Sequence, residues 1–352
     1  MGATGKDPRV RLIRVARDGP TCKADCLNHL YRALRKREIS SGERAGFVVL
    51  HDAEDMVDRA ALPLLAGAMS EYDFVQLPVL ALPQRHSIWI AGHYCDEFAE
   101  AHARTMVVRD ALGAPIPGAG VGCAISRGML DKLDQARGGH GPFAVGALTE
   151  DYELGLTVGT LGGRGKFLRC RTTDGRLIAT RAYFPSDIVS AVRQKTRWIH
   201  GIALQGWDRL GWGGKPIALW MQLRDRRGPF AAFLLALAYS LILLVGLEQG
   251  LVMAGLTPFV PLSPELLLLL MLNTGVLIWR AVLRVIFTGR EHGLAEALLA
   301  APRIVISNAI AILAGRRAFA AYLASLRGAP FAWDKTDHRH HPTVDIEQLA
   351  RR

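Results

Sequence analysis

Hydrophobic and polar positions divide the chain into two parts with different patterns. Over residues 1–185, short apolar or alternating runs are interspersed with segments of helical periodicity. Strands favour β-branched runs and a period of two, whereas helices favour 3.6, so this succession predicts an α/β fold. The predicted strands cover residues 10–16, 47–50, 73–82, 166–170 and 177–184. The predicted helices cover residues 23–37, 61–69, 91–113 and 127–136.

After Pro185 the pattern becomes amphipathic and then strongly apolar. Residues 186–228 have helical periodicity and carry four tryptophans: Trp198, Trp207, Trp212 and Trp220. Aromatic and basic residues in this arrangement are typical of a membrane interface, although ordinary core packing would also explain them. Residues 229–247 contain no charge, and residues 266–279 form a second uncharged run. Both are close to the ~20 residues that span a bilayer, so we predict two transmembrane helices within 229–290.

The arginines around these two runs predict an orientation. Arg224, Arg226 and Arg227 precede the first run, and Arg280, Arg284 and Arg290 close the second, whereas the link over 248–265 has no Lys or Arg. The positive-inside rule therefore predicts that the α/β part lies in the cytoplasm. A third apolar stretch is broken by Pro302 and Arg303, and we expect residues 291–328 to lie along the cytoplasmic surface rather than form a third span. Residues 329–352 form a polar tail.

The charge balance narrows the class of partner. The 352 residues carry a net charge of +11, with a pI near 9.8 and a mean hydropathy of +0.17. Such a charge favours nucleic acid, phosphorylated ligands or an anionic membrane. No RNA-binding or helix-turn-helix signature is present, so we expect no nucleic-acid partner. The five cysteines have no framework spacing and predict reduced thiols.

A cluster of acids follows the predicted strand over 47–50. Asp52, Glu54 and Asp55 lie at its carboxyl end, where α/β sheets bind ligands. Closely spaced carboxylates suit a hard cation, Mg²⁺ or Mn²⁺, which could hold a diphosphate. The alternative is a solvated loop whose acids, Asp55 or Asp58, cap the next helix.

Two further segments could carry chemistry. Thr149, Glu150 and Asp151 lie where a loop meets a helix, and they either cap that helix or provide a general base, Asp151. In "RQKTRW", at 193–198, the basic side chains could bind phosphate oxygens and Trp198 could stack on a sugar.

The order of these motifs resembles that of the membrane-embedded family-2 glycosyltransferases of the cellulose-synthase type. The resemblance implies a GT-A-like (Rossmann-like) domain over 1–185, an interfacial region over 186–228 and then the spanning helices. It implies inverting transfer from a nucleotide-diphospho sugar, such as a UDP-sugar, to a growing envelope or exopolysaccharide acceptor. It also implies that the protein lies in the lipid bilayer of the bacterial inner membrane. Its implied partners are proteins of secretion or of the outer membrane.

The same resemblance implies roles for single residues. Asp52, Glu54 and Asp55 fall on the motif for metal and diphosphate, with Mg²⁺ or Mn²⁺ as the cofactor. Asp151, together with Thr149 and Glu150, falls on the catalytic-base motif. The residues implied for binding the nucleotide sugar are Lys23, Gly120 and Gly122. Those implied for the acceptor and the diphosphate are Gln194, Arg197 and Trp198. A gating loop is implied at Asp334, Lys335 and Thr336.

The start of the chain departs from the family pattern. Family members open with a strand and an acidic residue that contacts the nucleotide base, whereas this sequence begins near the second strand, at 10–16. Either the start site is misassigned or the chain is a truncated relative, and in the second case we expect a sheet without one inner strand. A truncated, catalytically impaired relative that serves as a membrane scaffold is the alternative function.

Overall fold

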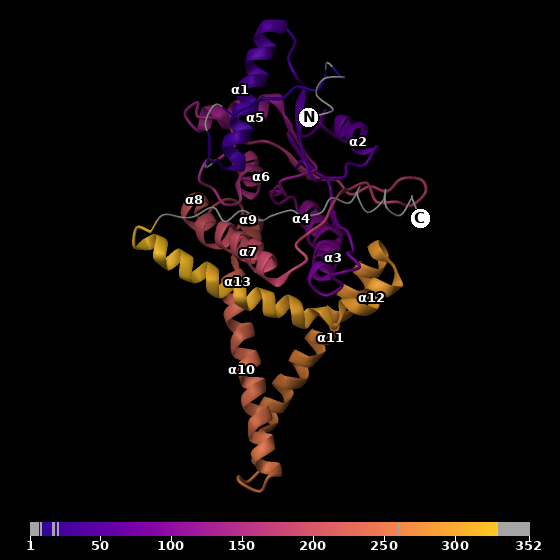
Figure 1. The fold of residues 1–352 in the computed structure, drawn as a ribbon, viewed down its shortest axis with the longest axis vertical. Helices are drawn as coiled ribbons and strands as arrows, with labels where there is room; N and C mark the ends of the chain where they lie inside the picture. The colour runs from indigo at the N-terminus through magenta and orange to yellow at the C-terminus, as the bar shows by residue number, and fades with distance from the viewer. Residues whose placement is uncertain (1–6, 8, 16–17, 20, 260, 330–352) are drawn as a thin grey trace.

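Two long helices project from one end of an α/β unit (Figure 1). The computed structural model describes residues 7, 9–15, 18–19, 21–259 and 261–329. The strands are β1 (Phe47–Leu50), β2 (Phe74–Gln76), β3 (Val79–Ala81), β4 (Cys123–Ser126), β5 (Gly165–Phe167) and β6 (Thr180–Ala182). The helices of the α/β unit are α1 (Lys23–Ser41), α2 (Ala61–Ala68), α3 (Ile90–Glu100), α4 (Met106–Ala111), α5 (Arg127–Ala136) and α6 (Glu150–Thr160). They are followed by α7 (Ile188–Ile199), α8 (Gly206–Leu210), α9 (Pro216–Arg226), α10 (Gly228–Met253), α11 (Pro264–His292), α12 (Leu294–Ala300) and α13 (Arg303–Leu326), with π-helical turns at Ala101–Thr105 and His200–Gln205.

The main sheet is mixed and has the order β1-β4-β2-β5. β4 pairs antiparallel with both β1 and β2, and β2 pairs parallel with β5. Phe74 of β2 and Ile125 of β4 are fully buried and pack with α1, α5 and α6 in one apolar core. The α/β fold predicted from the sequence is therefore confirmed, and its sheet ends near the acidic motifs.

The strand predicted over 73–82 is two strands in two sheets. β2 ends at Gln76, and the N–H of Leu77 then bonds the carbonyl of Gly122 at 2.9 Å. Pro78 has no N–H to continue a ladder, so the chain leaves the main sheet at that residue. β3 pairs instead with β6 in a parallel two-stranded sheet.

The strand predicted over 10–16 is wrong for the part that the structure describes. Residues 10–15 have no strand partner, and Val10, Leu12 and Ile13 are exposed. Alternating residues can form a strand only where another strand offers its backbone groups. Among the described residues, β4 is the one strand that pairs with β1, so β1 is an edge strand.

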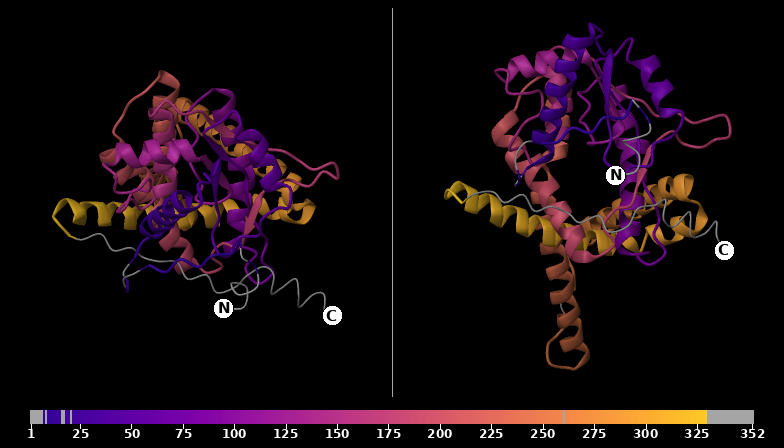
Figure 2. Two further views of the ribbon diagram at one scale, coloured as in Figure 1. Left: turned by 90° about the horizontal axis from the view of Figure 1, so that it is seen from above. Right: turned by 45° about the horizontal axis from the view of Figure 1, so that its top comes forward.

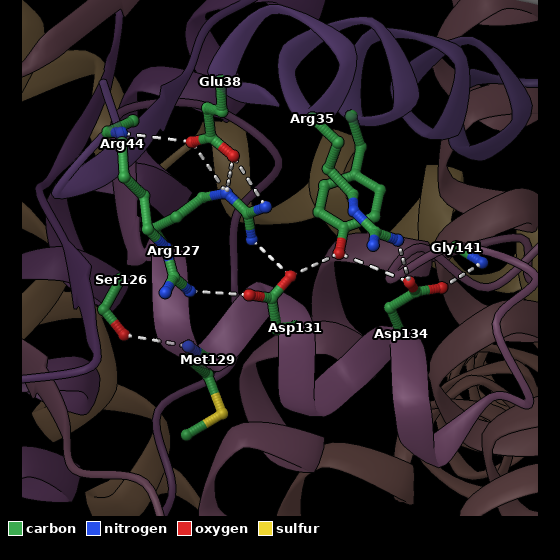
Figure 3. A network of polar contacts seen from close by, with 11 residues as sticks. Arg35, Glu38, Arg44, Ser126, Arg127, Met129, Asp131, Asp134 and Gly141 are labelled. Carbon is green, nitrogen blue, oxygen red and sulfur yellow. Dashed lines mark hydrogen bonds and ion pairs between the residues drawn. The ribbon is translucent and has the colours of Figure 1, made fainter. Parts of the chain in front are cut away.

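Charged side chains hold α1 against α5 (Figure 3). The guanidinium of Arg127 is almost buried and pairs with Glu38 at 2.9 Å and Asp131 at 2.5 Å. The hydroxyl of Tyr31 donates to Asp131 at 2.7 Å. A buried pair of this kind has to be fully hydrogen-bonded to persist. The network fixes the position of α1, whose first residue is Lys23.

The apolar half has three helices long and apolar enough to cross a membrane: α10, α11 and α13. Side chains over 240–250 of α10 and 264–280 of α11 are exposed, as expected of helices that face lipid, whereas the last part of α11, over 281–292, is largely partly buried. Both helices project away from the α/β unit, whereas α13 runs across its base and packs against α7 and α10 (Figures 1 and 2).

A buried ion pair joins α13 to α3. Arg303 and Asp96 are both completely buried, with 3.1 Å between Nη1 and Oδ1. Arg303 also pairs with Glu296 at 2.5 Å and donates to the carbonyl of Ile88 at 2.7 Å. The arginine that interrupts the third apolar stretch therefore anchors this helix to the α/β unit.

Candidate functional site

The first acidic motif, with Asp52, Glu54 and Asp55, follows the end of β1 at the edge of the main sheet. The carbonyl of Leu50, the last residue of β1, accepts a hydrogen bond from the N–H of Gly122 at 2.9 Å. Asp52 follows in the next turn, and its carboxylate is about a third exposed. Asp55 turns back into the loop, where its Oδ2 accepts the N–H of Asp52 at 2.8 Å. The carboxylate of Asp55 is thus committed to the turn, and Asp52 is the acid that faces the site.

Lys23 brings a positive charge to Asp52. Its Nζ lies 2.6 Å from Oδ1 of Asp52 and donates to the carbonyl of Gly120 at 3.1 Å. Burial acts to lower the pKa of Lys23, but the nearby carboxylates of Asp52, Asp151 and Glu150 outweigh it and raise the pKa overall. The ammonium therefore stays charged within an acidic cluster.

A glycine-containing loop between residues 118 and 122 forms the wall of the site. Gly120 and Gly122 have φ angles of 80° and 62°, a region in which side chains are strained. A buried side chain, Gln76, holds this loop. Its Oε1 accepts the N–H of Ala119 and its Nε2 donates to the carbonyl of Val121, both at 2.8 Å. Sequence reasoning missed Gln76; a polar residue inside the apolar run "FVQLPVL" was the available signal.

The first turn of α6 places Asp151 against this loop. A β-carbon on Gly120 would lie 2.8 Å from Oδ2 of Asp151, and one on Gly118 would lie 2.6 Å from its backbone oxygen. Only glycine permits this approach. The N–H of Tyr152 donates to Oδ1 of Asp151 at 2.8 Å, which orients the carboxylate. Thr149 precedes α6 but makes no capping bond with its side chain.

Burial disfavours ionisation of the carboxyl groups of Glu150 and Asp151. Loss of solvent raises the pKa of both carboxyl groups, and the charge of Asp151 raises that of Glu150 further. Lys23 and Arg197 oppose this rise at both groups. A carboxylate with a raised pKa is a stronger base than an ordinary one, and such perturbed groups gather at functional sites.

The segment with Gln194, Arg197 and Trp198 lies on α7, close to the acids. The positive charge of Arg197 acts to lower the pKa of both Glu150 and Asp151. A β-carbon on Gly201, just after α7, would lie 2.7 Å from the hydroxyl of Thr149, so the two segments are in contact. Gln194 is buried, and its Oε1 has no hydrogen-bond partner within the described part of the chain.

Trp198, which the sequence suggests as a surface for stacking a sugar, lies among other aromatic side chains. Its ring meets those of Tyr94, Phe98 and Phe184 edge-on, at centroid distances of 6.2, 6.1 and 6.5 Å. The ammonium of Lys195 lies 4.9 Å from the centre of the ring. The ring thus contributes to the packing of α7 against α3.

The structure brings together Lys23, Asp52, Gly120 and Asp151, with a small cavity beside Lys23, Gly120 and Asp151. Gly122 lies in the wall between β1 and β2, and Glu54 is half-buried in the turn after Asp52. Asp334, Lys335 and Thr336 lie outside the described residues.

The residues fit a divalent cation only in part. Over the described ranges, no three His, Cys, Asp or Glu side chains are grouped to hold a metal ion. Mg²⁺, however, usually binds one or two carboxylates and takes its other ligands from phosphate and water. The partly exposed carboxylate of Asp52 meets that requirement, whereas Asp55, turned into its loop, does not.

A sheet edge that combines Asp52, a glycine loop and Asp151 agrees with what the sequence comparisons find. Residues 47–281 match the glycosyl transferase family group 2, and the chain belongs to that family. Two curated relatives are each 34% identical over 94% of this chain: bacteriophage adsorption protein B of Escherichia coli K12 and bacteriophage N4 adsorption protein B of Escherichia coli O157:H7. The alignment covers 47% of each relative, so the chain spans about half their length. The family predicted from the order of the motifs is confirmed.

Proposed function

We propose that this protein transfers a sugar, with inversion, from a nucleotide-diphospho sugar such as a UDP-sugar to a hydroxyl of a growing glycan. The observation that carries the proposal is the meeting of Asp52, Lys23 and Asp151 around Gly120 at one end of the sheet. One buried carboxylate and a separate cationic group are what a single displacement requires.

Asp151 is the general base in this proposal. Its carboxylate takes the proton of the acceptor hydroxyl while the hydroxyl oxygen bonds to the anomeric carbon. The bond between that carbon and the phosphate oxygen breaks, and its electron pair leaves with the diphosphate. The opposite approach of nucleophile and leaving group inverts the anomeric centre. The raised pKa of Asp151 makes its carboxylate a stronger base than that of an ordinary aspartate.

Positive charge next to the acids stabilises the leaving diphosphate. Lys23 and Arg197 both act electrostatically on Asp151, so a diphosphate bound there would be within reach of both charges. A Mg²⁺ or Mn²⁺ ion, when bound, would supply further positive charge, and Asp52 would hold it. Gly120 lines the small cavity beside Lys23 and Asp151, and Gly122 supports that wall through backbone hydrogen bonds with Leu50 and Leu77. Gln194 offers an acceptor hydroxyl its Oε1, which has no hydrogen-bond partner among the described residues.

We also infer that α10 and α11 span the bacterial inner membrane, with the α/β unit in the cytoplasm. The exposed apolar surfaces of both helices and the arginines at their ends support this orientation. In this arrangement α13 lies along the membrane surface. The product is then an envelope or exopolysaccharide, which partner proteins in secretion or the outer membrane would receive.

The experiment that tests the function measures nucleoside diphosphate released from a panel of sugar donors by membranes that contain the protein, with Mg²⁺ or Mn²⁺. We expect release by the wild type, loss of release in Asp151→Asn, and unchanged release in Asp174→Asn, whose side chain is 69% exposed in a loop. A wild type that releases nothing from any donor would favour the non-catalytic scaffold.

A further inference from the structure

We propose that Lys23 is an internal counter-ion that occupies the cation position at Asp52 until a diphosphate draws it away. Donor and divalent cation would then bind together rather than independently. The inference rests on the proposed function and adds an order of binding to it.

The position of the ammonium supports this inference. Nζ of Lys23 lies 2.6 Å from Oδ1 of Asp52 and 3.1 Å from the carbonyl oxygen of Gly120. A β-carbon on Gly120 would lie 3.5 Å from this Nζ and 2.8 Å from Oδ2 of Asp151. The ammonium therefore lies on the same wall of the site as Asp151 while it is paired with Asp52.

The surroundings hold the charge in place. The side chain of Lys23 is only 28% exposed, and α1 is fixed by Arg127, Glu38 and Asp131 near its other end (Figure 3). A divalent cation at Asp52 would meet this ammonium at close range, and repulsion between like charges in a half-buried site is strong. The pair thus disfavours cation binding when no donor is present.

A diphosphate reverses this balance. It carries more negative charge than Asp52, and the flexible four-carbon stem of lysine lets the ammonium turn from one anion to the other. Asp52 is then free to accept a cation that also contacts the phosphates. By linkage, a donor that strengthens cation binding is itself bound more tightly in the presence of the cation.

The alternative is a salt bridge that only ties α1 to the loop after β1. In that case, removing the lysine lowers the thermal stability of the protein and leaves its affinity for cations unchanged. The inference instead requires the affinity to rise when the lysine charge is removed.

The test measures Mn²⁺ binding by electron paramagnetic resonance on the purified full chain in detergent, with and without UDP. We expect Lys23→Met and Lys23→Gln to bind Mn²⁺ roughly tenfold more tightly than the wild type without UDP. UDP should strengthen binding to the wild type and add little in these variants. Lys23→Arg keeps the charge and should behave like the wild type, and Asp52→Asn should abolish the site.

Lys166→Met is the matched control, because Lys166 forms a similar pair with Asp110 at 2.7 Å on another part of the sheet. It should leave Mn²⁺ binding unchanged. Equal Mn²⁺ affinity in the wild type and both uncharged variants, with binding still dependent on Asp52, would overturn the inference and leave the proposed function standing. No Asp52-dependent binding even with UDP would overturn the cation position itself, and the inference with it.

Discussion

Gly120 and Asp151 lie so close together that a β-carbon at position 120 would be 2.8 Å from Oδ2 of Asp151. The conformation of Gly120, with φ at 80°, brings the loop backbone against the first turn of α6. The carboxylate is thus positioned by the absence of a side chain on its neighbour. This contact leads to the first prediction.

Gly120→Ala should displace the carboxylate of Asp151 and reduce turnover about 100-fold, the cost of misplacing a reacting group by about an ångström. The unfavourable φ should also lower the free energy of unfolding by about 1–3 kcal/mol. Gly113→Ala is the control, since Gly113 has φ at 63° but no atom within 4 Å of an added β-carbon. It should show the loss of stability without the loss of turnover. Equal turnover in the two variants would refute the contact.

The raised pKa of Asp151 predicts how activity depends on pH. The base works only when ionised, so kcat/KM should fall as the pH drops through its pKa, which burial raises above the ordinary value of about 3.9. Glu150 and Asp151 interact, so the observed value belongs to the pair. Glu150→Gln removes one negative charge and should move the acid limb to lower pH. An acid limb centred below pH 4 in the wild type would contradict this assignment.

The buried pair of Arg303 and Asp96 predicts a large loss of stability when one partner is removed. Arg303→Met leaves Asp96 charged and buried, which should lower the free energy of unfolding by about 3–5 kcal/mol. Burial already raises the pKa of Asp96 to about 6, so the loss should be larger at pH 8, where Asp96 is ionised, than at pH 5.

Arg44→Met is the comparison for this pair. Arg44 binds Asp131 at 2.6 Å but is 61% exposed, so its removal should cost about 1 kcal/mol or less. Thermal and denaturant unfolding in detergent measure both variants. The double variant Asp96→Asn/Arg303→Met should lose less than the sum of its single changes. Additive losses would mean that the two side chains do not depend on each other.

The membrane orientation can be tested by cysteine labelling. In a cysteine-free background, a cysteine at the exposed position of Pro258, between α10 and α11, should react with an impermeant maleimide on intact cells. A cysteine at Asp174 in the α/β unit should react only after the membrane is opened. Labelling of position 258 only after opening would reverse the proposed orientation.

Local patterns predicted much of the fold, and long-range partners account for the errors. The apolar runs located α10 and α11, and the periodicity over 23–37 located α1. The alternation over 10–16 could not show whether another strand lies beside it. Arg303 was expected only to interrupt a helix, because its partner, Asp96, lies 207 residues away in the sequence.

The order of the motifs along the chain predicted which residues belong to the candidate site, but not how their side chains are arranged. Lys23, Asp52 and Asp151 come from three separate segments, and the structure brings them together. The order of motifs could not reveal that Lys23 pairs with Asp52, that Asp55 folds into its own turn, or that Gln76 holds the glycine loop. Each of these depends on side-chain directions that only the folded chain defines.

The most direct test of the central claim compares Asp151→Asn with the wild type in nucleoside diphosphate release and in donor binding. Loss of the base should lower the rate of release about 10²- to 10⁴-fold, while UDP still binds because Lys23 and Asp52 are intact. Asp174→Asn should match the wild type in both assays. Release at the wild-type rate from Asp151→Asn would contradict the account.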